Sequence, residues 1–198
     1  MFFLLSLFAY LVGSVPFGYL IVLIFAGSDI RSTGSGNIGA TNVMRTLGLL
    51  GAVCTLILDI AKGYLVVLFT NYVEPNNSKI VAVVMISVVV GHVFPIFLKF
   101  RGGKGVATSA GVLLYLSLTS VLITFIIFGL VVFFTRIVSL GSIIAVVSCP
   151  IVYFFLVYRQ EPIFPIFLAS LCCAVLVILC HWKNICRILA GSENRLIR

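Results

Sequence analysis

Long apolar runs separated by short polar segments make up most of this chain. A helix rises about 1.5 Å per residue, and the hydrocarbon core of a bilayer needs about 20 residues of helix. The runs lack the strict alternation that a barrel strand requires. The pattern therefore predicts an all-α, polytopic bundle of membrane helices. The predicted spans cover residues 2–27, 47–72, 80–98, 106–135, 138–157 and 162–181.

The run 106–135 decides how often the chain crosses the membrane. It is short for two full spans, but it contains the polar patch Ser117, Thr119 and Ser120, a weak turn signal. If the run crosses once, the basic C-terminal tail lies opposite the first two basic loops, against the positive-inside rule. A short hairpin at about 106–135 brings these basic segments to one side. We therefore predict seven transmembrane helices, with the N-terminus outside and the C-terminus cytoplasmic.

On this topology, nearly all of the positive charge lies on the cytoplasmic side. The exceptions are Lys62, Lys79 and Arg159. The cytoplasmic cations are Arg31, Arg45, Lys99, Arg101, Lys104, Arg136, Lys183, Arg187, Arg195 and Arg198.

The composition supports a membrane protein and excludes several other classes. The 198 residues are 62% hydrophobic and 9% charged, whereas soluble domains are about 25% charged. So few charges cannot cover a globular surface, and we expect one integral membrane domain over residues 1–198. The net charge of +8 is assigned to membrane orientation, and no nucleic-acid partner is expected. The six cysteines include no CxxC pair, which argues against a zinc site or a disulfide framework.

The first polar segment, residues 29–46, has the composition of a phosphate cradle. Its glycines match GxGxxG, but a membrane bundle offers no βαβ unit, so a dinucleotide fold is excluded. Glycine still lets the backbone approach an anion closely, and the N-terminus of the next helix attracts negative charge. The alternative is a flexible loop with a helix cap. The candidate ligands are Ser35, Gly36, Asn37, Thr41, Asn42 and Arg45.

The second polar segment places a lysine among glycines. Gly102, Gly103 and Gly105 surround Lys104, and Thr108 follows one helical turn later. The Walker A spacing is absent, but a lysine at a helix start is a suitable point charge for a phosphoryl oxygen. His92 precedes this loop and is either a buried hydrogen-bonding residue or an acid–base group.

The third polar segment lies in the C-terminal tail. His181, Asn184 and Arg187 can share one face of a short amphipathic helix that ends near Gly191. The alternative is a tail helix lying on the membrane surface.

Asp59 and Lys62 stand three residues apart inside the second span. Because charges in a bilayer are usually paired, we expect an ion pair that braces the bundle, and a direct catalytic role is the alternative.

The segments GSGNIGATNVMRTLG, GHVFPIFLKFRGGKGVATSAG and HWKNICRILAGSE together resemble the bacterial membrane acyltransferases of the PlsY type. The resemblance covers the whole chain. It implies transfer of an acyl group from acyl phosphate to the primary hydroxyl of glycerol 3-phosphate, giving lysophosphatidic acid. It also implies a multi-pass protein of the bacterial cytoplasmic (inner) membrane whose site faces the cytoplasm. The HxxxxD pair of acyl-CoA-dependent enzymes is absent, because Phe97 and Cys186 stand at the fifth position after the two histidines.

The resemblance also implies roles for individual residues. The expected catalytic residues are Ser35, Arg45, His92, Lys104, His181 and Asn184. The expected substrate-binding residues are Gly36, Asn37, Thr41, Asn42, Gly102, Gly103, Thr108 and Glu193. The expected partners are acyl phosphate, glycerol 3-phosphate and membrane lipids, with no metal, no cofactor and no obligate protein partner.

Two questions about mechanism and class stay open at this point. A phosphate oxygen of the acyl donor is the favoured acceptor of the hydroxyl proton, and His92 or His181 as general base is the rival. A small transporter of anions or phosphate esters is the alternative class, since polar glycine segments also suit a carrier. A CDP-alcohol transferase is excluded, because the clustered aspartates of a two-metal site are missing.

Overall fold

The computed structural model describes residues 1–157 and 163–196, and all regular secondary structure within these ranges is helical. The predicted loop 159–162 and Arg198 lie outside the described residues. Two 3₁₀ turns, Ile30–Ser32 and Ile96–Leu98, interrupt the α-helices. The α-helices are α1 (Phe2–Gly13), α2 (Phe17–Ala26), α3 (Ala40–Val73), α4 (Ser78–Val93), α5 (Val106–Leu116), α6 (Leu118–Thr135), α7 (Val138–Val157), α8 (Ile163–Cys180) and α9 (Trp182–Leu189).

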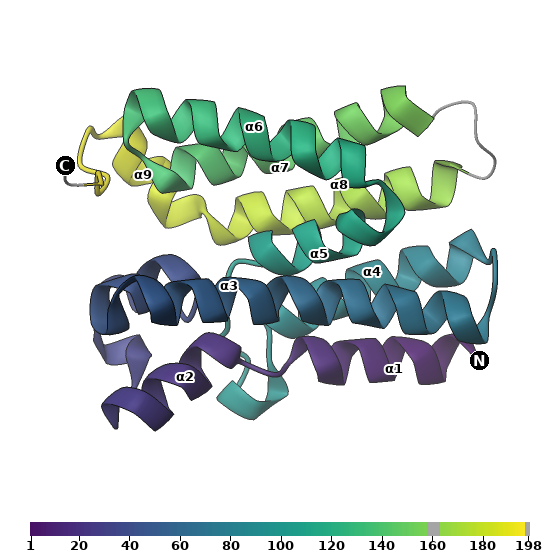
Figure 1. Cartoon of the computed structure of the whole chain (residues 1–198), viewed down its shortest axis with the longest axis horizontal. Helices are drawn as coiled ribbons and strands as arrows, with labels where there is room; N and C mark the ends of the chain where they lie inside the picture. The colour runs from purple at the N-terminus through teal and green to yellow at the C-terminus, as the bar shows by residue number, and fades with distance from the viewer. Residues whose placement is uncertain (158–162, 197–198) are drawn as a thin grey trace.

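The helices form two groups with α5 between them (Figure 1). One group contains α1 to α4, in which α1 packs on α4 and α2 on α3; the other contains α6, α7 and α8. Contacts of α4 with α8 and of α3 with α5 join the groups. The two chain ends lie at opposite ends of the bundle, with α9 beside the C-terminus (Figure 1). At that end, the amide of Leu196 donates to the carbonyl of Arg136 over 2.8 Å.

The first two predicted spans differ from the structure in detail. The run 2–27 is not one helix, because it breaks between α1 and α2 at Ser14–Pro16. Proline has no backbone N–H and cannot continue a helical hydrogen-bond ladder. The second predicted span corresponds to α3, which begins at Ala40, seven residues before the predicted start at 47. This helix is kinked at Gly48, whose φ is 73°. Glycine tolerates this left-handed value without a steric penalty.

The predicted division of the run 106–135 is confirmed. The chain breaks at Ser117, which separates α5 from α6 and whose hydroxyl accepts a hydrogen bond from the amide of Ser120. The run 80–98 forms α4 followed by the turn at Ile96–Leu98. Helix α3 begins inside the first polar segment, one residue before Thr41.

Five stretches of the described residues are long and apolar enough to cross a membrane. The pair α8 and α9, bent by 59°, gives a sixth if it is counted as one span, whereas α5 is a shorter apolar helix. The five stretches are Phe2–Ala26, Ala40–Val73, Ser78–Leu98, Leu118–Thr135 and Val138–Val157. An all-helical membrane bundle is therefore confirmed, and the count of seven crossings with the N-terminus outside stays a prediction.

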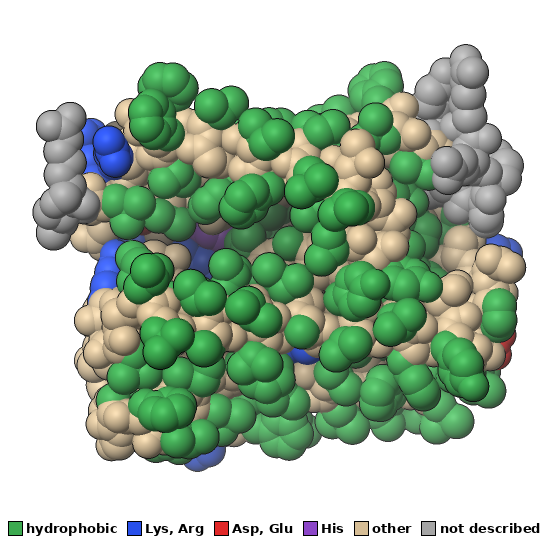
Figure 2. All heavy atoms as spheres, viewed as in Figure 1, with side chains coloured by type: hydrophobic (Ala, Val, Ile, Leu, Met, Phe, Trp, Pro, Cys, Tyr) green, Lys and Arg blue, Asp and Glu red, His purple; other side chains and the backbone are tan. Residues whose placement is uncertain are grey.

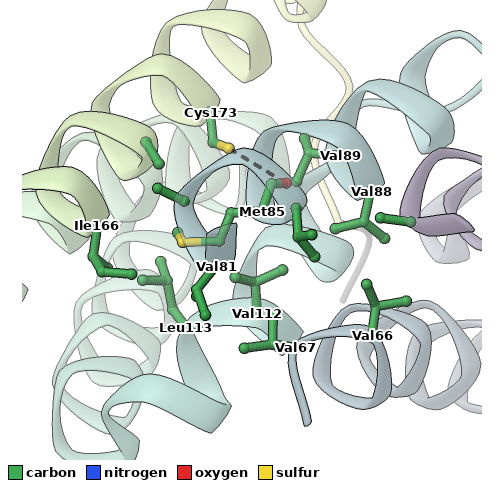
Figure 3. Close-up of a cluster of buried hydrophobic side chains, with 14 of the residues drawn as sticks. Val66, Val67, Val81, Met85, Val88, Val89, Val112, Leu113, Ile166 and Cys173 are labelled. Atoms are coloured by element: carbon green, nitrogen blue, oxygen red, sulfur yellow. Dashed lines mark hydrogen bonds between the residues drawn. The ribbon is translucent and has the colours of Figure 1, made fainter. Parts of the chain in front are cut away.

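Hydrophobic side chains cover most of the visible surface, and the charged side chains lie mainly toward the two ends (Figure 2). The interior is packed largely with β-branched residues from α3, α4, α5 and α8 (Figure 3). Helices approach closely at glycines: a Cβ on Gly111 would lie 2.0 Å from the carbonyl oxygen of Ile60, and one on Gly63 would lie 2.3 Å from that of Thr108. Small residues at such crossings are typical of membrane helix packing. This contact fixes the start of α5 against α3.

Candidate active site

The loop before α3 is held in shape by Asn42. The side-chain amide nitrogen of Asn42 donates to the carbonyls of Ile30, Thr33 and Asn37 at 2.9–3.2 Å. Its carbonyl oxygen accepts from the amide of Ser35 at 2.9 Å. Asn42 is buried, with 2% of its surface exposed. Its polar atoms are used inside the protein, where they shape the loop, and the substrate contact expected of Asn42 stays a prediction.

The other polar residues of this loop remain accessible. Ser35, Gly36 and Thr41 are exposed, and Asn37 is half-buried with its side chain accepting from the amide of Gly39. Gly34 and Gly36 have φ values of 56° and 70°, so the turn needs residues that tolerate the left-handed region.

Arg45 lies one turn into α3, close to this loop. Its side chain is exposed, and its Cδ would lie 3.4 Å from a Cβ placed on Gly34. Among the described residues, no acidic side chain lies within salt-bridge distance of Arg45. The guanidinium is therefore available to an anion at the mouth of the loop.

The glycine loop around Lys104 is supported by the end of α4. The amides of Gly102 and Gly103 donate to the carbonyls of Val93 and His92, each over 3.1 Å. Gly105 has a φ of 85° and begins α5. These contacts fix the backbone on both sides of Lys104. Gly103 is buried against the ring of His92. Because glycine has no side chain, its predicted substrate contact could involve only the backbone.

Lys104 is the first member of a chain of side-chain contacts that reaches the C-terminal tail. Its Nζ donates to Oδ1 of Asn184 over 2.6 Å, and Nδ2 of Asn184 donates to Oε1 of Glu193 over 2.6 Å. Glu193 also accepts from the hydroxyl of Ser139 at 2.8 Å and from Nε of Arg187 at 2.6 Å. The tail and α9 therefore hold Asn184 against Lys104.

The surroundings shift the pKa values of Lys104 and Glu193, the two ends of this chain of contacts. Burial lowers the pKa of Lys104 to about 8; the carboxylate of Glu193 opposes this shift, and the charges of Arg187 and Arg45 add to it. Burial alone would raise the pKa of Glu193, but hydrogen bonds from Arg187, Asn184 and Ser139 outweigh it and leave that pKa below its ordinary value. Glu193 is therefore an anion with all its partners inside the protein.

Arg45 is near enough to Lys104 for its positive charge to contribute to the lowered pKa of the lysine. Figure 2 shows Lys, Arg and His side chains around a hollow between the two groups of helices, toward the end where the C-terminus lies. Among the residues that the structure describes, no three His, Cys, Asp or Glu side chains form a metal site.

The two histidines are both buried, with different partners. His92 is 4% exposed, and its Nδ1 lies 2.8 Å from Nζ of Lys62. His181 is 2% exposed, and its Nδ1 lies 2.8 Å from the carbonyl oxygen of Val177. The expected ion pair between Asp59 and Lys62 is confirmed, with 2.7 Å between Oδ1 and Nζ.

One residue expected in the site is fully buried in this structure. Thr108 lies in the α3–α5 packing, and its hydroxyl has no hydrogen-bond partner among the described residues, so its substrate contact stays a prediction. Sequence reasoning missed Ser139, at the start of α7, which donates a hydrogen bond to Glu193. A serine in an apolar run does not by itself indicate a functional residue. It also missed the contact of Lys62 with His92, which joins residues on different helices.

Comparisons with known proteins agree with this geometry. The sequence profile described as glycerol-3-phosphate acyltransferase matches residues 3–191. The chain is 47% identical to the glycerol-3-phosphate acyltransferase of Endomicrobium trichonymphae over 187 residues, which cover 94% of this chain and 92% of that protein. It is 44% identical to the enzyme of the same name from Syntrophotalea carbinolica, over 98% of this chain and 97% of that protein.

Two solved structures share the fold. One is the crystal structure of PlsY, an integral membrane glycerol 3-phosphate acyltransferase, in its glycerol 3-phosphate form, with a TM-score of 0.91 and 36% identity over 99% of this chain and 96% of that one. The other is its lysophosphatidic acid form, with a TM-score of 0.88 and 35% identity over 99% and 95% of the two chains. These matches decide for an acyltransferase and against the transporter.

Proposed function

The chain belongs to the glycerol-3-phosphate acyltransferase family, and we propose that its acyl donor is an acyl phosphate. It is a PlsY-type membrane enzyme, and the reaction belongs to phospholipid biosynthesis. In the proposed reaction, the acyl group passes to the primary hydroxyl of glycerol 3-phosphate. The products are lysophosphatidic acid and inorganic phosphate.

The observation that carries the proposal is Lys104, held by Asn184, with a second cation, Arg45, near enough for its charge to lower the pKa of Lys104. An acyl phosphate and glycerol 3-phosphate bring two phosphate groups to one site. Arg45 offers a planar guanidinium suited to bidentate phosphate binding, and Lys104 offers a point charge. Ser35 and Thr41, both exposed beside Arg45, supply hydroxyl donors.

The carboxylates near the site favour proton transfer to the substrate. Glu193 accepts hydrogen bonds from Arg187, Asn184 and Ser139, and both oxygens of Asp29 accept from Arg31. Hydrogen bonding to Arg31 lowers the pKa of Asp29, so this group is a weak base. We propose that a phosphate oxygen of the donor takes the proton while the hydroxyl oxygen attacks the acyl carbon. The bond from that carbon to the phosphate oxygen then breaks, and the phosphate leaves with the proton.

An apolar groove on the same two helices that follow the polar loops supports the proposal that the protein binds a fatty acyl chain. The groove has a volume of about 340 Å³ and lies between α3 and α5. Burial of an acyl chain contributes about 0.8 kcal/mol per CH₂ group, so such a surface can hold the donor. The lining residues are Ile57, Ile60, Ala61, Tyr64, Leu65 and Leu114.

We further propose that the site faces the cytoplasm of a bacterial inner membrane. Arg136 and the C-terminal tail share one end of the bundle, and the site lies toward that end (Figure 2). Lys79 lies at the other end, beside Phe2 and the turn between α3 and α4. This asymmetry agrees with the positive-inside rule. The proposed partners are the two substrates and the surrounding lipids.

The test is an assay of purified protein in detergent with palmitoyl phosphate and glycerol 3-phosphate. We expect inorganic phosphate and lysophosphatidic acid to form in equal amounts, and only when both substrates are present. Lys104→Met should abolish product formation, and Lys79→Met, at the far end of the bundle, should not change it. Product formation from palmitoyl coenzyme A but not from palmitoyl phosphate would overturn the proposed donor.

A further inference from the structure

A buried polar cluster lies where α1, α3 and α4 meet. It consists of Asp59, Lys62 and His92, which are 3–4% exposed. Nζ of Lys62 lies 2.7 Å from Oδ1 of Asp59, 2.8 Å from Nδ1 of His92 and 3.1 Å from the carbonyl oxygen of Val15. An ammonium group has three N–H donors and no acceptor. Two of these contacts, with Nδ1 of His92 and the carbonyl of Val15, are hydrogen bonds, and the contact with Asp59 is an ion pair.

The contact with Val15 explains why Lys62 is held at this place. Val15 lies in the break between α1 and α2, and the following Pro16, which has no N–H, precedes the first residue of α2. A carbonyl left without a helical partner inside a membrane protein needs another donor. Lys62 supplies it, so the ammonium is anchored by main chain as well as by Asp59.

This anchored ammonium decides the protonation of the His92 ring. Because Lys62 can only donate, Nδ1 of His92 must accept, and the ring proton lies on Nε2. The competing contact, from Nδ1 to Oδ1 of Asp59, is longer at 3.5 Å. A proton on Nδ1 would face the ammonium at 2.8 Å, with two donors opposed.

His92 in turn supports the glycine loop. Its carbonyl accepts from the amide of Gly103, and Nε2 lies so close that a Cβ on Gly103 would be 2.0 Å from it. The next residue is Lys104. The protonated side of the ring therefore faces the backbone that carries the substrate-binding lysine.

His181 has the opposite arrangement. Its Nδ1 lies 2.8 Å from the carbonyl oxygen of Val177. A carbonyl can only accept, so Nδ1 carries the proton and Nε2 of the neutral ring has the lone pair. Of the two histidines, only His181 keeps a nitrogen that can take a proton without giving up its present partner.

We propose that Lys62 is a positioning residue that fixes His92 as the Nε2–H tautomer, so that His92 acts as a hydrogen-bond donor beside the glycine loop and not as a general base. Lys62 acts on the reaction through His92 and the backbone next to Lys104. The kinetic consequences rest on the proposed function, whereas the tautomer does not.

The chain has two histidines, which makes the tautomer measurable. Nitrogen-15 NMR of histidine-labelled protein, assigned with His92→Gln, should show the proton on Nε2 in His92 and on Nδ1 in His181. Lys62→Met should mix the two forms of His92, and the control Lys79→Met should leave both rings unchanged. A proton on Nδ1 of His92 in the unmodified protein would overturn the proposal, as would a His92 spectrum that does not respond to a folded Lys62→Met variant.

Two substitutions of His92 give a second, kinetic readout. Glutamine places an amide N–H near the position of Nε2, whereas asparagine places its amide near Nδ1 and leaves the Nε2 position empty. We expect kcat/KM of His92→Gln to stay within about tenfold of the unmodified enzyme and that of His92→Asn to fall at least tenfold further. Loss of a general base would lower both alike, by roughly 10²–10⁴. Equal kcat/KM values for the two variants would therefore refute the donor role, even if Lys62→Met fails to fold.

Discussion

Nζ of Lys104 donates a hydrogen bond to Oδ1 of Asn184 over 2.6 Å, although the two residues are 80 positions apart in the chain. Asn184 is held by Glu193, and Glu193 is held by α7 and α9. The position of the lysine therefore depends on the C-terminal segment as much as on its own glycine loop. This arrangement gives the site a cation that is already in place before substrate arrives.

The lowered pKa of Lys104 predicts a pH dependence of activity. With a pKa of about 8, Lys104 is charged below that pH and loses its charge as the pH rises through it. We expect kcat/KM for glycerol 3-phosphate to fall above about pH 8. Lys104→Arg should move this basic limb upward by more than one pH unit, because arginine stays charged. A pH–rate profile measures the limb; Lys183→Arg, on the exposed side of α9, is the control, and an unmoved limb in Lys104→Arg would contradict the prediction.

Glu193→Gln should shift the same limb in the opposite direction. The negative charge of Glu193 raises the pKa of Lys104, so neutralising it should bring that pKa below 8. The basic limb of kcat/KM then moves to lower pH. Glu74→Gln, at the opposite end of the bundle, should leave the limb in place. If both variants give the unmodified profile, Lys104 is not the group that titrates.

Arg45→Lys tests the bidentate contact proposed for the guanidinium. Losing one charge-assisted hydrogen bond costs about 1.5–3 kcal/mol, which corresponds to a decrease in kcat/KM of about 10- to 150-fold. Steady-state kinetics measures this decrease, and Arg195→Lys in the exposed tail should stay within about twofold. An unchanged kcat/KM for Arg45→Lys would remove Arg45 from the site.

Gly111→Ala tests the close approach of α5 to α3. The added Cβ would lie 2.0 Å from the carbonyl oxygen of Ile60, so the helices must separate. Overpacking of this kind costs about 1–3 kcal/mol, and Tm in detergent should fall. In α6, Gly129 has nothing within 4 Å of an added Cβ, and Gly129→Ala should leave Tm unchanged or slightly higher, since alanine favours helices. Equal Tm values for both variants would show that α3 and α5 are far enough apart to accept a methyl group at position 111.

The sequence predicted much of the fold because membrane helices follow from local composition. Apolar runs indicated the helices, and the serines near position 117 indicated the break between α5 and α6. The break at Pro16 was missed, because an uncharged run longer than twenty residues reads as one span even with a proline inside. The kink at Gly48 was missed because an isolated glycine within a helical pattern gives a weak signal.

The sequence predicted the members of the site better than their roles. Asn42 and Thr108 have side chains that suit a phosphate ligand, but whether they face a ligand or the protein depends on the path of distant segments. Asn42 turned inward because three loop carbonyls surround it. Thr108 is enclosed because α5 packs against α3 at Gly63. The partner of His92 lies 30 residues away on another helix, and no spacing within one helix could have indicated it.

The central claim is that Arg45 and Lys104 bind phosphate groups in one site. The most direct test is a structure of this chain with glycerol 3-phosphate and a non-hydrolysable acyl phosphonate. We expect Nζ of Lys104 and the guanidinium of Arg45 each to lie within about 3.2 Å of a phosphate or phosphonate oxygen. Ligands that occupy another part of the bundle, or that leave either cation without such a contact, would contradict the account.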